Sequence, residues 1–151
     1  GTSSFRAYRL DAAGEVRDRI ETGQGILEVP PGAFPEALRR AIGPWLAAGE
    51  RLVLLCGMVG SRQGWVEAPY VETPATAASI AASACRVPDL ERPVHILPGV
   101  AQRNASTPDV MRGEETQILG LPERAGGTGG LDLVCMPGTH SKWVAPPACR
   151  T

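Results

Sequence analysis

The chain begins with alternating hydrophobic and polar positions and then changes to a helical period. Residues 5–10 and 15–20 are each typical of a strand, and residues 11–14 between them predict a turn that makes a hairpin. Further along, hydrophobic residues recur every three or four positions, which predicts an amphipathic helix with one buried face. Its apolar positions are Phe34, Leu38, Ala41, Ile42, Trp45 and Leu46, with Pro35 in the first turn and Gly49 as the C-terminal cap.

Continuous hydrophobic runs of strand length follow, and they predict strands covered on both faces. The runs are residues 51–59, 93–100 and 131–136. Between them, residues 74–85 are alanine-rich and predict a helix. Thr107-Pro108-Asp109 carries the hydroxyl, proline and acid that start a helix, which we expect to end near Leu119. This order of elements predicts an α/β fold with a mixed sheet and helices on its faces.

Composition narrows the classes of function. With 43% hydrophobic and 21% charged residues, the chain has the composition of a globular domain. A net charge of -1 and 5% aromatic residues argue against nucleic acid as a partner, and no hydrophobic stretch is long enough to cross a membrane. Cysteines and histidines lack the spacing of zinc ligands, so no metal-ligating set is predicted. Cys56 and Cys135 lie in hydrophobic runs, and we expect them to be buried, reduced thiols of a cytoplasmic protein.

Two similar glycine turns lie near the two ends of the sequence. They consist of Gly1, Thr2, Ser3 and Ser4, and of Gly138, Thr139, His140 and Ser141. Glycine lets backbone N–H groups approach a phosphate closely, and hydroxyls add donors. The pair predicts a duplicated nucleotide-binding architecture with one phosphate loop in each half. Lys142, directly after the second turn, either neutralises phosphate or, as is commoner at a strand end, is solvated.

Two adjacent carboxylates, Glu114 and Glu115, are candidates for catalysis. They lie four residues after Val110 and Met111 on the predicted helix, so they fall on the face expected to be buried. A buried acid is costly unless it is paired or used, so the pair indicates a general base or a carboxylate that orients a substrate hydroxyl. The alternative is that the helix turns both acids to solvent at its edge.

Polar side chains also follow the predicted central strands, where ligands of open α/β sheets bind. Arg62 and Gln63 follow the first of these strands, and a guanidinium suits a carboxylate or a phosphate. The alternative is a solvated loop arginine that caps Glu67 or a backbone carbonyl. Gln102 follows the next strand and offers hydrogen bonds to sugar hydroxyls, although most such amides are turn residues. Arg112, directly before the glutamates, suits an anionic group.

Four motifs, taken in order, resemble the 2-dehydro-3-deoxygalactonokinase family over essentially the whole chain. The motifs are GTSSFRAY from Gly1, CGMVGSRQGW from Cys56, MRGEETQ from Met111 and PGTHSKW from Pro137. The resemblance implies an α/β, actin-like ATPase (ribonuclease H-like) domain with a mixed sheet and flanking helices. It also implies phosphorylation of 2-dehydro-3-deoxy-D-galactonate at its 6-hydroxyl by ATP with Mg²⁺, a step of bacterial galactonate catabolism.

The resemblance further implies roles for the residues singled out above. The base would be Glu114 or Glu115. The keto-acid end of the substrate would bind Arg62, Gln63 and Arg112. Both glycine turns would bind ATP phosphates. Residues 1–125 would form the N-terminal, substrate-side domain, 126–130 a glycine-rich linker, and 131–151 the start of a truncated ATP-binding domain. The aspartate that family members carry two positions before the glycine matching Gly1 is absent, so we expect the fragment to be inactive alone.

Two alternatives remain open at this point. The first is a kinase of another sugar or sugar acid, and the second is a non-catalytic actin-like binding module. The expected partners are a small sugar acid and ATP, with a homodimer of the full-length protein.

Overall fold

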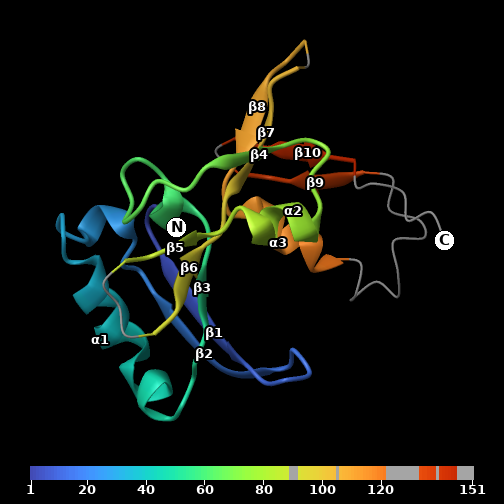
Figure 1. The fold of residues 1–151 in the computed structure, drawn as a ribbon. Helices are drawn as coiled ribbons and strands as arrows, with labels where there is room; N and C mark the ends of the chain where they lie inside the picture. Colours follow the sequence, from blue (N-terminus) through green and yellow to red (C-terminus); the bar gives the residue numbers. More distant parts are fainter. Residues whose placement is uncertain (89–91, 105, 122–132, 139, 146–151) are drawn as a thin grey trace.

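The computed structural model describes residues 1–88, 92–104, 106–121, 133–138 and 140–145, which form a mixed α/β structure (Figure 1). The predicted α/β class is confirmed for this part of the chain. The elements are β1 (Phe5–Leu10), β2 (Val16–Thr22), η1 (Ile26–Glu28), α1 (Phe34–Ala47), β3 (Val53–Leu55), η2 (Met58–Gly60), β4 (Tyr70–Glu72), α2 (Ala77–Ala82), β5 (Cys85–Arg86), β6 (Val94–Ile96), β7 (Gly99–Gln102), β8 (Asp109–Met111), α3 (Glu114–Leu119), β9 (Val134–Met136) and β10 (Lys142–Val144).

The hairpin and the helix predicted at the start of the chain are confirmed. β1 pairs antiparallel with β2, and α1 has Pro35 in its first turn. The helix buries Leu38, Ile42 and Trp45 in the main hydrophobic core. Nε1 of Trp45 donates to a carboxylate oxygen of Asp18 at 2.9 Å, which ties α1 to β2.

The first continuous hydrophobic run forms a shorter strand than the sequence predicts. β3 ends at Leu55, because Gly57 has a φ of +85°, a conformation that L-residues rarely adopt, and the chain then turns into η2. Leu52 and Leu54 are 59% and 57% exposed, so the prediction of a strand covered on both faces is wrong for the described residues. Cys56 lies at the bend and is exposed, against the expectation of a buried thiol.

The second hydrophobic run is divided between two sheets. β6 lies between β3, to which it is parallel, and β5, to which it is antiparallel. β7 lies between β4, to which it is parallel, and β8, to which it is antiparallel. The chain passes from one sheet to the other at Pro98, which has no N–H to continue the ladder of β6. Ile96 and Pro98 are among the most deeply buried side chains, so the change of sheet lies in the interior.

The two later helices are also shorter than predicted. α2 has six residues, and Thr76 and Ser79 exchange capping hydrogen bonds at its start. The helix start predicted at Thr107-Pro108-Asp109 is wrong, because Asp109 opens β8, which pairs with β7, and α3 begins only after Gly113. Pairing with a neighbouring strand has outweighed a local helix-start signal.

β9 and β10 form an antiparallel hairpin (Figure 1). β9 covers the last three residues of the strand predicted at 131–136, whose first two residues lie outside the described residues, as does the predicted linker 126–130. Cys135, expected to be buried, is exposed because it is the outward-facing residue of β9.

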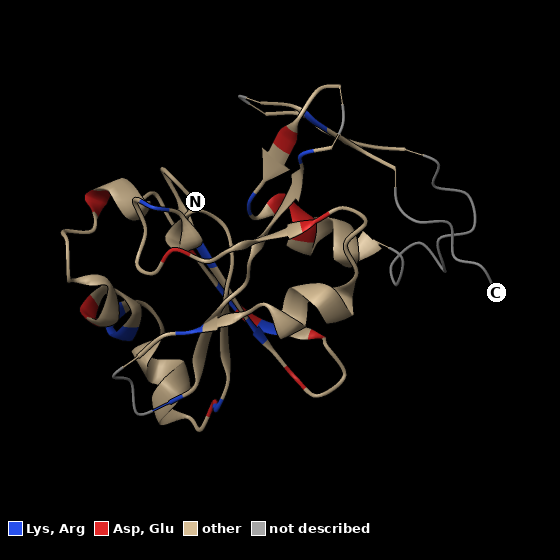
Figure 2. Cartoon of the chain, turned by 45° about the horizontal axis from the view of Figure 1, so that its top comes forward, with Lys and Arg blue, Asp and Glu red and all other residues tan. Residues whose placement is uncertain are grey.

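Acidic and basic residues are spread over the described fold rather than gathered in one region (Figure 2). This distribution agrees with the net charge of -1. Among the described residues, none of the helices has the length and apolar character needed to cross a bilayer.

Candidate functional site

The turn between β8 and α3 holds the two candidate carboxylates. Gly113, with a φ of +111°, donates its backbone N–H to both carboxylate oxygens of Glu115, at 2.8 and 2.7 Å. The backbone N–H of Arg112 donates to Oε2 of Glu114 at 3.0 Å. Both side chains therefore fold back onto the turn and satisfy backbone donors at the start of the helix.

The two carboxylates differ in burial. Glu115 is only 3% exposed, so its expected burial is confirmed, whereas Glu114 is half-buried. Burial raises the pKa of Glu115 above its ordinary value, and the hydrogen bond from Gly113 opposes part of that rise. A substrate hydroxyl can approach Glu114 more easily than Glu115.

Arg112 anchors the same turn to the segment before β4. Its Nη2 donates to the carbonyl oxygen of Ala68 at 2.9 Å, and its guanidinium carbon lies 4.2 Å from the centre of the Tyr70 ring. Nε and Nη1 of Arg112 are buried and have no hydrogen-bond partner in the described structure. Because buried donors without partners are costly, a water molecule or an anionic group would be stabilised beside them.

The loop after β3 packs directly against this turn. A Cβ atom added to Gly113 would lie 3.0 Å from the Cα atom of Gly57. A Cβ atom on Gly60 would lie 3.2 Å from Nη1 of Arg112 and 2.7 Å from Cγ2 of Ile96. Glycine at these positions lets the loop after β3 approach the start of α3, so the first residues of the motif that begins at Cys56 pack against the motif that begins at Met111.

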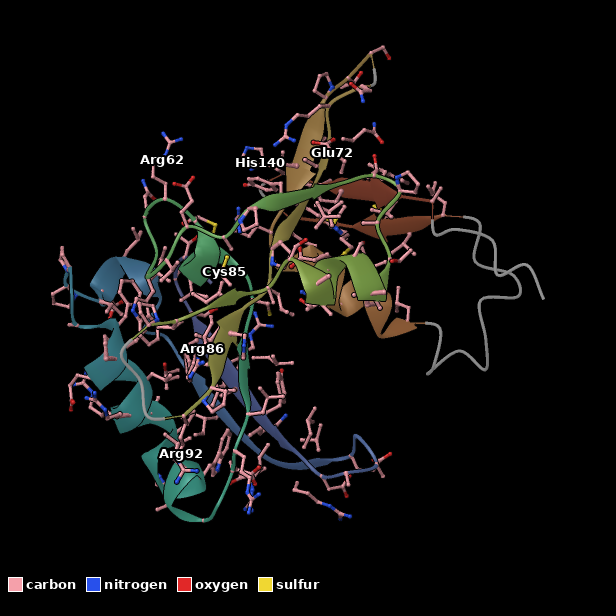
Figure 3. The ribbon with its side chains drawn as sticks, in the orientation of Figure 1. Arg62, Glu72, Cys85, Arg86, Arg92 and His140 are labelled. Carbon is pink, nitrogen blue, oxygen red and sulfur yellow. The ribbon has the colours of Figure 1, made fainter. Side chains whose placement is uncertain are left out.

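Arg62 and Gln63 lie at a separate cavity of about 400 Å³. Its lining is Val29, Pro31, Gly32, Phe34, Arg62, Gln63, Gly64 and Trp65. The rings of Phe34 and Trp65 stack with 6.1 Å between their centres, which gives the cavity an aromatic wall. Arg62 points outward from its loop (Figure 3), and its Nε lies 3.9 Å from a carboxylate oxygen of Glu67. The contact of Arg62 therefore agrees with the alternative of a loop arginine that caps Glu67.

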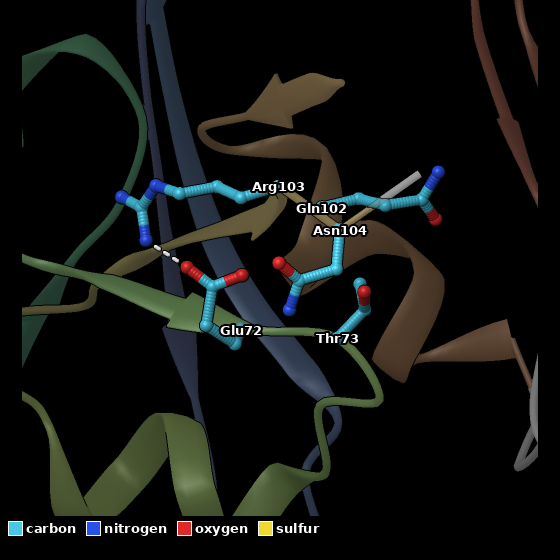
Figure 4. A pocket seen from close by; sticks show the side chains of 5 residues that line it. All are labelled: Glu72, Thr73, Gln102, Arg103 and Asn104. Atoms are coloured by element: carbon cyan, nitrogen blue, oxygen red, sulfur yellow. Dashed lines mark hydrogen bonds and ion pairs between the residues drawn. The ribbon is translucent and has the colours of Figure 1, made fainter. Parts of the chain in front are cut away.

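Gln102 lies at a third place, a polar cavity of about 250 Å³ (Figure 4). The cavity is lined by Glu72, Thr73, Gln102, Arg103 and Asn104. Arg103 forms an ion pair with Glu72, and Gln102 extends away from that pair. The four predicted substrate-binding residues are thus divided between two cavities and the β8–α3 turn.

The first glycine turn is held by a close backbone contact that the sequence pattern did not single out. The carbonyl oxygen of Gly1 accepts a hydrogen bond from the N–H of Ile26 at 3.1 Å. A Cβ atom on Gly25 would lie 1.9 Å from the carbonyl oxygen of Thr2, so only glycine fits there. The available signal was the glycine pair at positions 23 and 25, directly after the predicted hairpin.

The second glycine turn leads into a buried lysine. Gly138, His140 and Ser141 are exposed, and Thr139 lies outside the described residues. Nζ of Lys142 lies 2.5 Å from Oδ1 of Asp109, so the interpretation of a solvated lysine is wrong. The ammonium group beside Asp109 holds the pKa of that carboxyl below its usual range. Within the described residues, no hydrogen bond or ion pair joins the two glycine turns directly.

Comparison with known proteins identifies kinases as the relatives of this chain. The chain belongs to the 2-keto-3-deoxy-galactonokinase family, whose model matches residues 1–148. It is 46% identical over 144 residues to a protein of Rhizobium meliloti (strain 1021) with the provisional name 2-dehydro-3-deoxygalactonokinase DgoK1, covering 95% of this chain and 46% of the relative. It is 42% identical over 92 residues to the 2-dehydro-3-deoxygalactonokinase of Escherichia coli (strain K12), covering 61% of this chain and 29% of that relative.

A solved structure of a similar protein has a fold that matches this chain. The crystal structure of a Sinorhizobium meliloti protein, provisionally named a 2-dehydro-3-deoxygalactonokinase, superimposes with a TM-score of 0.81 at 46% sequence identity. The match covers 95% of this chain and 46% of that one. The chain therefore spans about half the length of these relatives.

Proposed function

We propose that this chain is the substrate-side part of a kinase that transfers the γ-phosphoryl group of ATP to the 6-hydroxyl of 2-dehydro-3-deoxy-D-galactonate. The observation that carries the proposal is the family match over residues 1–148, together with the relatives' names. The β8–α3 turn supports it, because the turn carries a guanidinium and two carboxylates together and the loop after β3 packs against it.

Glu114 is the proposed base, and Glu115 holds the turn. A base must come within hydrogen-bond reach of the hydroxyl that it deprotonates. Glu114 is only half-buried, whereas both oxygens of the nearly inaccessible Glu115 are taken up by the N–H of Gly113. In phosphoryl transfer most of the catalysis comes from positioning and charge stabilisation, so the rigidity of the turn matters as much as the base.

The keto-acid end of the substrate is proposed to bind the arginines. Arg62 and Gln63 offer donors at the aromatic cavity. Arg112 contributes its positive charge from inside the fold, because its Nε and Nη1 are buried. Gln102 is proposed to bind a sugar hydroxyl.

The two glycine turns are proposed to hold the phosphates of ATP. Gly1 to Ser4 and Gly138 to Ser141 supply backbone donors in this proposal, with actin-like domains at residues 1–125 and from residue 131 onward, joined by the linker 126–130. Among the described residues, no group of three His, Cys, Asp or Glu side chains could hold a metal ion. Mg²⁺ in kinase sites is usually held by one or two carboxylates together with the substrate phosphates and water, so the ion would enter with ATP.

Binding and turnover test the proposal separately. Titration calorimetry of residues 1–151 with 2-dehydro-3-deoxy-D-galactonate should detect weak binding, and a coupled ADP-release assay of the same chain should detect no turnover. Placing the chain between the parts of the Rhizobium meliloti relative that precede and follow the matched region gives a polypeptide of the relatives' length and supplies the segment expected to carry the aspartate before Gly1. That fusion should release ADP fastest with this substrate among a panel of aldonates and keto-deoxy aldonates.

The role of Glu114 is tested in the same fusion. Glu114→Gln should lower kcat at least ~10²-fold, the lower range for loss of a general base. Glu36→Gln, which removes an exposed carboxylate from α1, is the matched control and should leave kcat unchanged. Faster turnover of another sugar acid would reassign the substrate, and no binding and no turnover with any of them would favour a non-catalytic module.

A further inference from the structure

The β9–β10 hairpin has little of its own to hold it in place. It is a two-stranded ribbon of three residues on each side, and isolated hairpins of that kind are at best marginally stable in water. Trp143 is 66% exposed, so this large side chain does not provide a hydrophobic anchor. Among the described residues, one side-chain ion pair ties the hairpin to the rest of the fold, and it joins Lys142 to Asp109.

That ion pair has the burial expected of a docking contact. The side chain of Lys142 is 11% exposed and that of Asp109 is 54% exposed. Lysine is almost never buried without a partner, since a buried ammonium group loses its hydration. Asp109 is therefore the group that makes the buried position of Lys142 tolerable.

The two partners lie next to the two parts of the candidate site. Asp109 is the first residue of β8, and Arg112 and the paired glutamates follow the last residue of that strand. Lys142 directly follows Ser141, the last residue of the second glycine turn. The contact between Asp109 and Lys142 therefore fixes the end of the second glycine turn relative to the start of β8, the strand that leads into the β8–α3 turn.

We infer that Asp109 is a positioning residue: by pairing with Lys142 it docks the β9–β10 hairpin on β8 and sets the second glycine turn relative to the β8–α3 turn. The docking is inferred from the ion pair and from the burial of Lys142. Its consequence for phosphate binding rests on the proposed function.

Amide hydrogen exchange of the 151-residue chain, followed by NMR, tests the docking. Asp109→Asn removes the charge, and it should lower the protection of the β9–β10 amides about tenfold while leaving β1–β2 unchanged. The charge-swapped double variant Asp109→Lys with Lys142→Asp should recover most of the protection. Glu50→Gln breaks the similarly half-buried pair of Arg9 and Glu50, at 2.6 Å, and should leave β9–β10 unaffected.

A second titration separates the docking from the proposed function. ATP added to the unaltered chain should shift the amide signals of Gly138, His140 and Ser141, and Asp109→Asn should weaken that response. If ATP shifts none of these signals in the unaltered chain, the proposed phosphate role fails while the exchange result still decides the docking. Unchanged exchange in Asp109→Asn, or an equal loss in β1–β2 and β9–β10, would overturn the inference.

Discussion

The contact between Gly57 and Gly113 gives the sharpest prediction, because a single methyl group tests it. Gly113→Ala places a Cβ atom 3.0 Å from the Cα atom of Gly57, where ordinary contacts begin near 3.4 Å. It also forces alanine to a φ of +111°, which costs on the order of 1–2 kcal/mol for an L-residue. Overpacking against backbone adds at least about 1 kcal/mol. We expect Gly113→Ala to lower the free energy of unfolding by about 2–4 kcal/mol.

Gly49→Ala is the matched control, because Gly49 has a φ of +106° and no atom within 4 Å of an added Cβ. It should cost only the backbone part, about 1–2 kcal/mol. Urea denaturation of both variants, with slopes equal to that of the unaltered chain, gives the two values directly. Equal destabilisation by the two substitutions would refute the close approach of the loop after β3 to the β8–α3 turn.

Three further experiments test other parts of the structure. Ile96→Ala, at a fully buried position, should destabilise the chain by about 2–5 kcal/mol, measured as a lower urea midpoint at unchanged slope. Trp45→Phe removes the donor to Asp18 and should lower the free energy of unfolding by about 1–3 kcal/mol. The same substitution should cost much less in a chain that already carries Asp18→Ala. Additive effects of the two substitutions would argue against the hydrogen bond. Because the pKa of Glu115 is raised from 4.5 in the folded chain, its ionisation opposes folding, and stability should fall as the pH rises from about 4.5 through the folded pKa. Glu115→Gln should remove that fall in stability. Urea titrations from pH 4 to 8 measure the free energy of unfolding of the unaltered chain and of the variant, and parallel pH dependence of the two would contradict the prediction.

The β1–β2 hairpin and α1 could be predicted from the sequence because their signals are local. Alternation sets the strands, and the spacing from Phe34 to Trp45 sets the buried face of the helix. β8 could not be predicted in this way, because its strand conformation depends on pairing with β7. The burial of Glu115 was predicted from a helix that included Val110 and Met111, but these two residues lie in β8 and α3 begins only at Glu114. The side chain of Glu115 is buried where it folds back onto Gly113.

The contacts that sequence reasoning missed join residues whose partners no local pattern could indicate. Gly25 packs on the backbone of Thr2, and Lys142 pairs with Asp109 on another strand. The motifs of the candidate site could be recognised, but their spatial grouping could not. Only the structure places Arg62 and Arg112 in different surroundings.

The contact of Gly57 with Gly113 also bears on how fast the site forms and breaks. The two residues are far apart in the chain, whereas β1, β2 and α1 are sequence neighbours, so closing the long loop between the glycines carries the larger entropic cost. Such a contact is expected to form after the folding transition state. Gly113→Ala should then speed unfolding and leave the folding rate nearly unchanged in stopped-flow measurements, so that the lifetime of the assembled site is set by how quickly this contact opens.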